Sequence, residues 1–143
     1  MDNHDNARFL SQYDNQGGFK NAVTFALTAR GIPFFYYGDE QGFKGGNDPD
    51  NRESLWNAMD TGSEMYKFVA TINAARKATQ GWDHEYVERY VLDNFFAYSF
   101  GEMLVVTTNS AEYMQVSMPL ARANWHFLKN KCRATRSATS STI

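Results

Sequence analysis

GIPFFYYGDE, residues 31–40, is a short apolar run that ends in a polar turn. Residues 32–37 carry no charge and follow a glycine, and Pro33 argues against a helix in so short a run. A continuous apolar run of this length favours a strand of a parallel sheet that is buried on both faces. In parallel α/β proteins the ligand-facing residues come directly after such strands. We therefore predict an α/β fold in which the residues after Tyr37 lie at the functional edge of the sheet.

The residues before this strand predict a helix. Residues 17–30 carry apolar side chains at helical spacing, and Gly31 would follow them as a C-cap. Asp14 or Asn15 is the candidate N-cap. The apolar positions are Phe19, Ala22, Val23, Ala26 and Leu27. Helix and strand together indicate part of a βαβ unit.

The residues after the strand predict a long loop and then a second helix. Residues 38–60 are rich in glycine, asparagine and aspartate, which is typical of a loop that carries function. Thr61-Gly62-Ser63-Glu64 resembles a capping box, and the helix behind it is expected to run to about Thr79. One face of that helix would carry Met65, Phe68, Val69, Ile72 and Arg76.

The pattern changes to strands after Gly81. Short runs rich in valine, tyrosine, phenylalanine and threonine are separated by turn residues, which predicts antiparallel strands joined by hairpins. The predicted strands are residues 86–90, 95–100, 103–108 and 113–118. Strands that follow helix–strand units indicate a second, all-β domain. Residues 119–143 show no strand alternation, carry five basic residues and no acid, and are interpreted as a divergent or disordered basic tail.

Composition argues against several classes of function. The chain has 143 residues, 43% of them hydrophobic, so it can bury one modest core. It is too short for a whole (β/α)8 barrel, which takes about 250 residues. A net charge of −2 and a pI of about 5.9 suggest neither nucleic acid nor an anionic membrane as a partner. The single Cys132 excludes an internal disulfide and a cysteine-based metal site.

A polar cluster, Asp2-Asn3-His4-Asp5-Asn6, stands near the start of the sequence. It places an imidazole beside a carboxylate, which is typical of polar recognition or acid–base chemistry and not of a core. Ligand-facing residues of parallel α/β proteins follow an apolar strand, and no apolar run precedes this cluster. We therefore expect the sequence to begin in or just after a strand whose body lies outside it.

Three stretches, taken together and in this order, resemble glycoside hydrolase family 13, the α-amylase family. Asn3-His4-Asp5 resembles the family's motif after the seventh barrel strand, and residues 31–40 resemble the eighth strand with its loop. Residues 45–53, GGNDPDNRE, resemble the sugar-contacting loop that follows. Asn6-Ala7-Arg8-Phe9 continues the first motif as in fungal-type α-amylases.

The resemblance is close over residues 1–80 and loose over residues 81–118. It implies the last two units of a (β/α)8 TIM barrel in residues 1–80 and a partial antiparallel β-sandwich domain in residues 81–118, with residues 119–143 as the tail. It also implies Ca²⁺ in the full-length family, with ligands outside this chain, so no metal-binding residue is named. Secretion is expected of the full-length family alone.

The resemblance assigns roles to four residues. The family is retaining, with one carboxylate as nucleophile, another as general acid/base, and an oxocarbenium-like transition state. Asp5 matches a third carboxylate, which would bind sugar hydroxyls and stabilise the transition state, and His4 would hydrogen-bond the same sugar. Asp48 and Arg52 would hold a glucose unit further toward the non-reducing end. The plainer alternatives are a solvated turn for the first pair and an intraloop ion pair for the second.

Five neighbouring residues have structural or open interpretations. Arg8 either supports the site electrostatically or forms a structural ion pair. Glu40 is expected to hold its loop in place. Tyr36 and Tyr37 are expected to pack in a core, although both could offer a surface on which a sugar stacks. Trp56 is expected to seal the loop.

The implied activity is hydrolysis of internal α-1,4-glucosidic bonds in starch, glycogen and maltooligosaccharides. A neopullulanase or cyclomaltodextrinase is the alternative within the family, because such enzymes can share the Gly-Gly-Asn-Asp-Pro sequence of residues 45–49. No residue of this sequence matches the family's nucleophile or general acid. A second hypothesis is therefore a truncated chain that is catalytically inactive and at most binds glucan.

Overall fold

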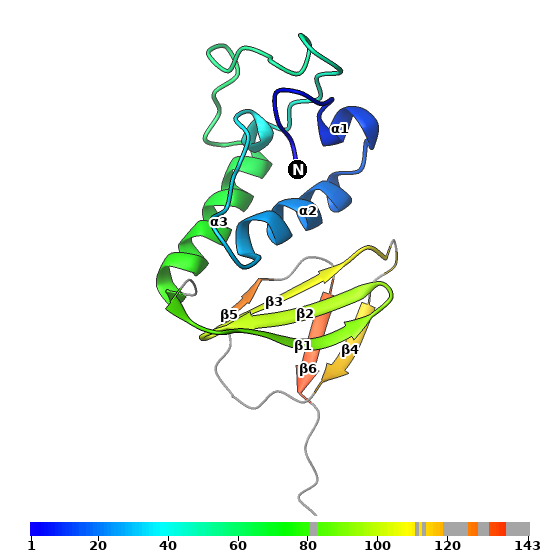
Figure 1. Cartoon of the computed structure of the whole chain (residues 1–143), viewed down its shortest axis with the longest axis vertical. Coiled ribbons are helices and arrows are strands. Elements are labelled where there is room, and N and C mark those ends of the chain that lie inside the picture. The colour runs from blue at the N-terminus through cyan, green and yellow to red at the C-terminus, as the bar shows by residue number, and fades with distance from the viewer. Residues whose placement is uncertain (81–82, 111, 113, 119–125, 129–131, 137–143) are drawn as a thin grey trace, which may run out of the picture. The chain divides into compact units, whose positions relative to one another are not determined.

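The computed structural model divides the chain into two compact units, residues 1–74 and 75–143 (Figure 1). None of the helices it describes is both long and apolar enough to cross a bilayer. The described residues are 1–80, 83–110, 112, 114–118, 126–128 and 132–136.

Helix α2, Gln16–Thr28, is the helix predicted before the apolar run, and it ends two residues earlier than expected. Its N-cap is Asn15, whose side chain accepts a hydrogen bond from the Gly18 N–H at 3.0 Å. The predicted apolar face is confirmed at Phe19, Val23 and Leu27, which are all buried. A short helix α1, Phe9–Gln12, precedes α2.

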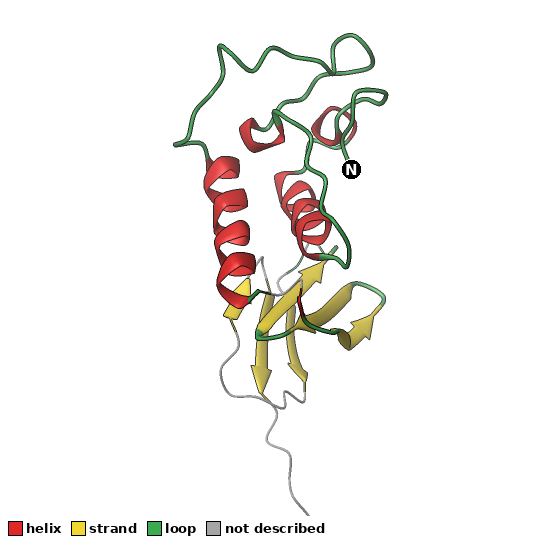
Figure 2. Cartoon of the chain, turned by 60° about the vertical axis from the view of Figure 1, so that its left-hand side comes forward, coloured by secondary structure: helices red, strands yellow, loops and turns green. Residues whose placement is uncertain are grey.

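Helix α3, Glu64–Thr79, confirms the second predicted helix. Its cap differs from the prediction, because Ser63 and not Thr61 holds the first turn. The Ser63 hydroxyl accepts a hydrogen bond from the Tyr66 N–H at 3.1 Å and donates one to the Glu40 carbonyl at 2.8 Å. α2 lies beside the first turns of α3 in both views, where Lys20 forms an ion pair with Glu64 (Figures 1 and 2).

The prediction of a buried strand over residues 32–37 is wrong in this structure. The segment is a loop (Figure 2), with Ile32 84% and Phe34 86% exposed. A parallel strand exists only when neighbouring strands accept and donate its backbone hydrogen bonds. The described part of residues 1–74 contains no strand at all, so this segment has nothing to pair with. The assignment of residues 1–80 to two barrel units stays a prediction.

The second unit confirms the first three predicted strands. Strands β1 (Tyr86–Leu92), β2 (Phe95–Phe100) and β3 (Met103–Thr108) form an antiparallel meander joined by short turns. Both faces of β2 and β3 are covered by buried side chains. One face carries Phe95, Ala97, Leu104 and Val106. The opposite face carries Tyr98, Phe100, Met103 and Val105.

The later strands pair differently from the prediction. Strand β4 (Met114–Met118) was expected to continue the antiparallel hairpins, but it pairs in parallel with β6 (Cys132–Arg136). Strand β5 (His126–Leu128) joins the meander beside β3, also in parallel. Parallel strands are joined by a crossover connection and not by a tight turn. The turn residues at 109–110, which lie between β3 and β4, therefore wrongly indicated a hairpin between these two strands. Val116 of β4 packs into the cluster around Phe95.

Strands β5 and β6 also correct the expectation that residues 119–143 contain no strand. Strands of three and five residues are too short to show a clear alternation of polar and apolar side chains. The remainder of that segment, and Tyr113 of the fourth predicted strand, lie outside the described residues. The division into residues 1–80, 81–118 and 119–143, and the partial β-sandwich, stay predictions.

Candidate functional site

The His4–Asp5 pair lies on a tight polar turn. The Asn3 side-chain oxygen accepts hydrogen bonds from the Asp5 N–H at 2.8 Å and from the Asn6 N–H at 3.1 Å, which is an Asx turn. The His4 Nε2 lies 3.2 Å from Asp5 Oδ1, and both side chains are exposed. The turn therefore presents an imidazole and a carboxylate together on the surface of the first unit.

The Asp48–Arg52 pair forms the intraloop ion pair that was the plainer alternative. Arg52 Nε lies 2.9 Å from Asp48 Oδ1, with 47% of the Arg52 side chain and 56% of the Asp48 side chain exposed. An exposed pair of this kind is worth only about 0.2–1 kcal/mol. Each side chain can therefore leave its partner and bind another hydrogen-bonding group at little cost in free energy.

The two loops that carry these pairs adjoin through Asn51. Its side-chain nitrogen donates to the His4 carbonyl and to the Asn6 carbonyl, each at 2.9 Å. Among the contacts of the described residues, none joins the His4–Asp5 side chains directly to those of Asp48 and Arg52. Sequence reasoning missed Asn51, since its partners are 45 and 47 residues away. The only sequence signal was its place inside the polar stretch 45–53.

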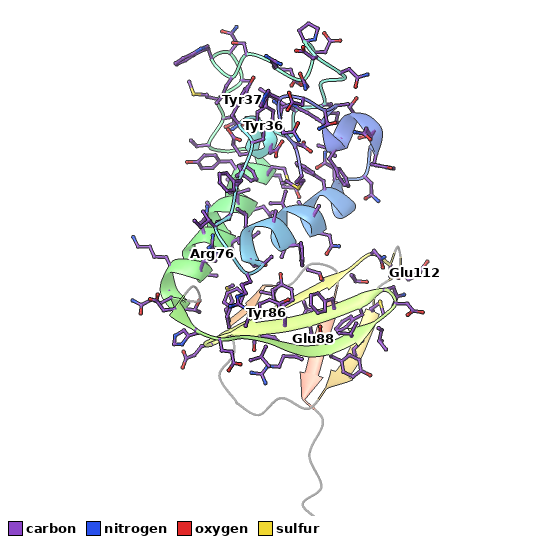
Figure 3. The ribbon with its side chains drawn as sticks, in the orientation of Figure 1. Tyr36, Tyr37, Arg76, Tyr86, Glu88 and Glu112 are labelled. Atoms are coloured by element: carbon purple, nitrogen blue, oxygen red, sulfur yellow. The ribbon has the colours of Figure 1, made fainter. Side chains whose placement is uncertain are left out.

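Arg8 is the fully buried centre of the unit, so the structural interpretation of this residue holds. Its Nε donates to Glu53 at 2.5 Å, and its Nη1 donates to the Tyr37 carbonyl at 3.0 Å and to Asp39 at 3.1 Å. The guanidinium carbon lies 4.6 Å from the centre of the Tyr36 ring. Tyr36 and Tyr37, labelled in Figure 3, thus pack on the Arg8 guanidinium and on each other, and form no strand core.

Gly45 places the 45–53 motif against Arg8. Its carbonyl accepts a hydrogen bond from the Arg8 N–H at 3.0 Å. A Cβ at this position would lie 1.9 Å from the Asp50 carbonyl oxygen, so only glycine fits. Glu53 closes the loop, because its other carboxylate oxygen accepts from the Lys44 N–H at 3.1 Å. The motif's spacing therefore has a structural reason.

Two other residues had structural expectations. Glu40 holds its loop as expected, since its carboxylate accepts from the Gly38 N–H at 2.9 Å. Trp56 does not seal the loop, because it is 83% exposed. The described residues hold no group of three or more His, Cys, Asp or Glu side chains that could bind a metal ion. The expectation that the Ca²⁺ ligands of the family lie outside this chain stays a prediction.

Asp39 is the most perturbed acid of the unit. Burial and the neighbouring Asp2 carboxyl raise the pKa of Asp39 to about 8, although the Arg8 guanidinium beside it acts in the opposite direction. Asp39 keeps its proton in the folded chain at pH values at which the unfolded chain has released it. The stabilisation of the fold that comes from this raised pKa is complete below pH 3.8, the ordinary pKa of the group. It is lost as the pH rises toward 8.

We expect Asp39→Asn to flatten the pH dependence of stability. The free energy of unfolding of the wild-type chain should fall between pH 5 and pH 8, by up to about 1.4 kcal/mol per pH unit from this group. The neutral amide cannot titrate, so that part of the slope should disappear. Urea unfolding at four pH values measures it, with the exposed Asp14→Asn as control. Equal slopes in the wild type and the Asp39 variant would contradict the assignment.

The comparisons with known proteins point to one family of sequences. A family model described as the catalytic domain of alpha amylase matches residues 1–95. The α-amylase of Saccharomycopsis fibuligera is 46% identical over 87 residues, which is 60% of this chain and 18% of that protein. The β/α-amylase of Paenibacillus polymyxa is 31% identical over 157 aligned positions, which cover 100% of this chain and 12% of that protein. The chain thus spans less than a fifth of either relative.

Solved structures give the same result. An α-amylase from Malbranchea cinnamomea matches with a TM-score of 0.70 and 34% identity, covering 76% of this chain and 24% of that one. A cyclomaltodextrinase matches with a TM-score of 0.73 and 30% identity, covering 85% of this chain and 22% of that one. The chain therefore has the local fold of part of these catalytic domains, together with a small antiparallel sheet.

Proposed function

We propose a function from one premise: this chain belongs to the α-amylase family of glycoside hydrolases. It forms part of an α-amylase that hydrolyses internal α-1,4-glucosidic bonds of starch, glycogen and maltooligosaccharides with retention. The observation that carries the proposal is that two exposed polar pairs, His4–Asp5 and Asp48–Arg52, lie on adjoining loops of one unit. Such an array offers several charged hydrogen-bonding groups to one chain of sugars.

Asp5 acts as the stabiliser of the transition state in this proposal. Its carboxylate accepts hydrogen bonds from sugar hydroxyls, and these bonds strengthen as the ring flattens toward the oxocarbenium ion. His4 donates to the same sugar. Support comes from the turn itself, because Asn3 holds the Asp5 backbone while both side chains stay exposed to solvent.

Asp48 and Arg52 bind a glucose unit further toward the non-reducing end. A planar guanidinium and a carboxylate can each form paired hydrogen bonds with neighbouring hydroxyls. The ion pair between them supports this role, because it pre-orients both groups and costs little to rearrange.

This 143-residue chain by itself binds glucan but does not hydrolyse it. Positioned contacts to hydroxyls supply neither a nucleophile nor a proton, and no residue here matches the family's nucleophile or general acid. The finer fold belongs to the same proposal, with residues 1–80 as the last two barrel units and residues 81–118 as a partial β-sandwich. A cyclomaltodextrinase is the second candidate, favoured by the coverage and TM-score of that solved structure.

Titration of the purified chain with maltoheptaose tests the proposal. We expect weak binding, an affinity at least about tenfold lower for Arg52→Met, and an unchanged affinity for the exposed Arg30→Met. Incubation with starch should release no reducing sugar. Reducing-sugar release would overturn the inactivity of the isolated chain. Absence of binding, or equal losses in the two arginine variants, would contradict glucan recognition by these loops. Tighter binding of β-cyclodextrin than of maltoheptaose would favour the second candidate.

A further inference from the structure

We propose that Asn51 is a positioning residue that sets the orientation of Asp5 toward the sugar. The inference rests on the proposed function, because it concerns the same site. Nothing in the family resemblance assigns a role to Asn51, which directly precedes Arg52 in the 45–53 loop.

Both polar atoms of the His4–Asp5 peptide unit are held by side-chain amides. Its N–H, on Asp5, donates to the Asn3 side chain at 2.8 Å. Its carbonyl, on His4, accepts from the Asn51 side chain at 2.9 Å. A peptide unit is planar, so fixing its two polar atoms fixes the position of the Asp5 Cα. Asn3 also holds the next peptide unit, because its side-chain oxygen accepts from the Asn6 N–H at 3.1 Å, and the two held units together set the direction in which the Asp5 side chain leaves the backbone. Asn3 supplies the local half of this arrangement, and Asn51 supplies the half that comes from the other loop.

Asn51 also holds a carbonyl on the other side of Asp5, that of Asn6. The same side-chain nitrogen donates to the Asn6 carbonyl at 2.9 Å, so its two protons serve the backbone on both sides of Asp5. Asn51 is fully buried, where hydrogen bonds are electrostatically stronger than they are in water. A neutral side chain with two donors suits two carbonyl acceptors, whereas a carboxylate of the same size would repel both of them.

The position of Asn51 in the chain couples the two pairs. It directly precedes Arg52, so the residue that orients Asp5 is also part of the backbone that carries the second pair. Any displacement of the Asp48–Arg52 loop therefore moves the donor on which the His4–Asp5 turn depends. We infer that one asparagine sets the spacing of the two sugar-binding pairs.

Two variants of the full 143-residue chain separate hydrogen bonding from space filling. Asn51→Asp keeps the volume and loses both donors, and Asn51→Ala loses both the volume and the donors. In either variant the ¹⁵N order parameter of the Asp5 amide should fall from about 0.85 to below about 0.6. Asn15→Ala is the matched control, because it removes a side-chain hydrogen bond elsewhere in the same unit and should leave that amide ordered. An ordered Asp5 amide in Asn51→Asp would overturn the proposal.

The affinity for maltoheptaose distinguishes this inference from the proposed function. We expect Asn51→Asp to bind at least about tenfold more weakly than the wild type, the effect of losing a buried hydrogen-bond partner. A disordered turn with unchanged affinity would overturn the positioning role. A different result would overturn the proposed function instead: the wild-type chain binds no maltoheptaose, but the turn still loses order in the variants. The role of Asn51 in ordering the Asp5 backbone would then hold.

A measurement on the wild type covers the case in which the variants fail to fold. The side-chain amide protons of Asn51 should exchange with solvent at least about tenfold more slowly than those of the exposed Asn47 in the same loop. Equal exchange rates would overturn the proposal, because they would mean that neither proton is held by a backbone carbonyl.

Discussion

Replacing Arg8 with methionine is expected to lower the free energy of unfolding by about 3–5 kcal/mol, the usual effect of removing one partner of a buried ion pair. Methionine retains the bulk beside the Tyr36 ring but removes every donor. The Glu53 carboxylate then loses the cation that compensates it, and Asp39, which is as fully buried as Arg8, loses a hydrogen-bond donor. The Tyr37 carbonyl loses its donor as well. No other single change in this unit should cost as much.

Chemical denaturation of the full chain measures this loss. Lys44→Met is the matched control, since it also removes a cation from an ion pair, but from one that is largely exposed. We expect that control to cost less than about 1 kcal/mol. Arg8→Lys should fall between the two, because an ammonium keeps the charge but cannot reach Glu53, Asp39 and the Tyr37 carbonyl at once. Equal losses for Arg8→Met and Lys44→Met would refute the central role of Arg8.

Asp5→Asn should produce the largest loss of activity wherever these loops sit in a complete enzyme. A suitable background is the Saccharomycopsis fibuligera α-amylase, with its matching segment replaced by the 87 aligned residues of this chain. We expect the hybrid to hydrolyse starch and Asp5→Asn to lower its kcat by roughly two to three orders of magnitude. The amide has the size of the carboxylate, but it lacks the negative charge that stabilises the positive charge of the developing oxocarbenium ion.

Steady-state kinetics on soluble starch provide the measurement. The loss should fall on kcat, with KM changed by less than about threefold, because the contact strengthens only in the transition state. Asp14→Asn in the same hybrid is the control, as its carboxylate is exposed and belongs to neither polar pair. A change confined to KM would show that Asp5 binds the ground state and does not stabilise the transition state.

Local signals in the sequence were sufficient for the helices and the hairpins. The spacing of Phe19, Val23 and Leu27, with Asn15 before them, predicted α2 because each helical hydrogen bond links residues only four positions apart. Turn residues between β1, β2 and β3 predicted their antiparallel pairing for the same reason. The cap of α3 was misplaced by two residues, since Thr61 and Ser63 carry equivalent hydroxyls and only the bond to Tyr66 distinguishes them.

The sequence by itself determined α2, α3, the three-stranded meander and the identity of the exposed polar pairs, and its motifs indicated the family. Only the tertiary structure decided that residues 32–37 form no strand, that β4 and β5 find parallel partners, that Arg8 is buried, and that Asn51 joins two loops. The physical reason is distance along the chain. The contacts of Arg8 and Asn51 span 29 to 47 residues, and no local pattern of polar and apolar side chains encodes a partner so far away.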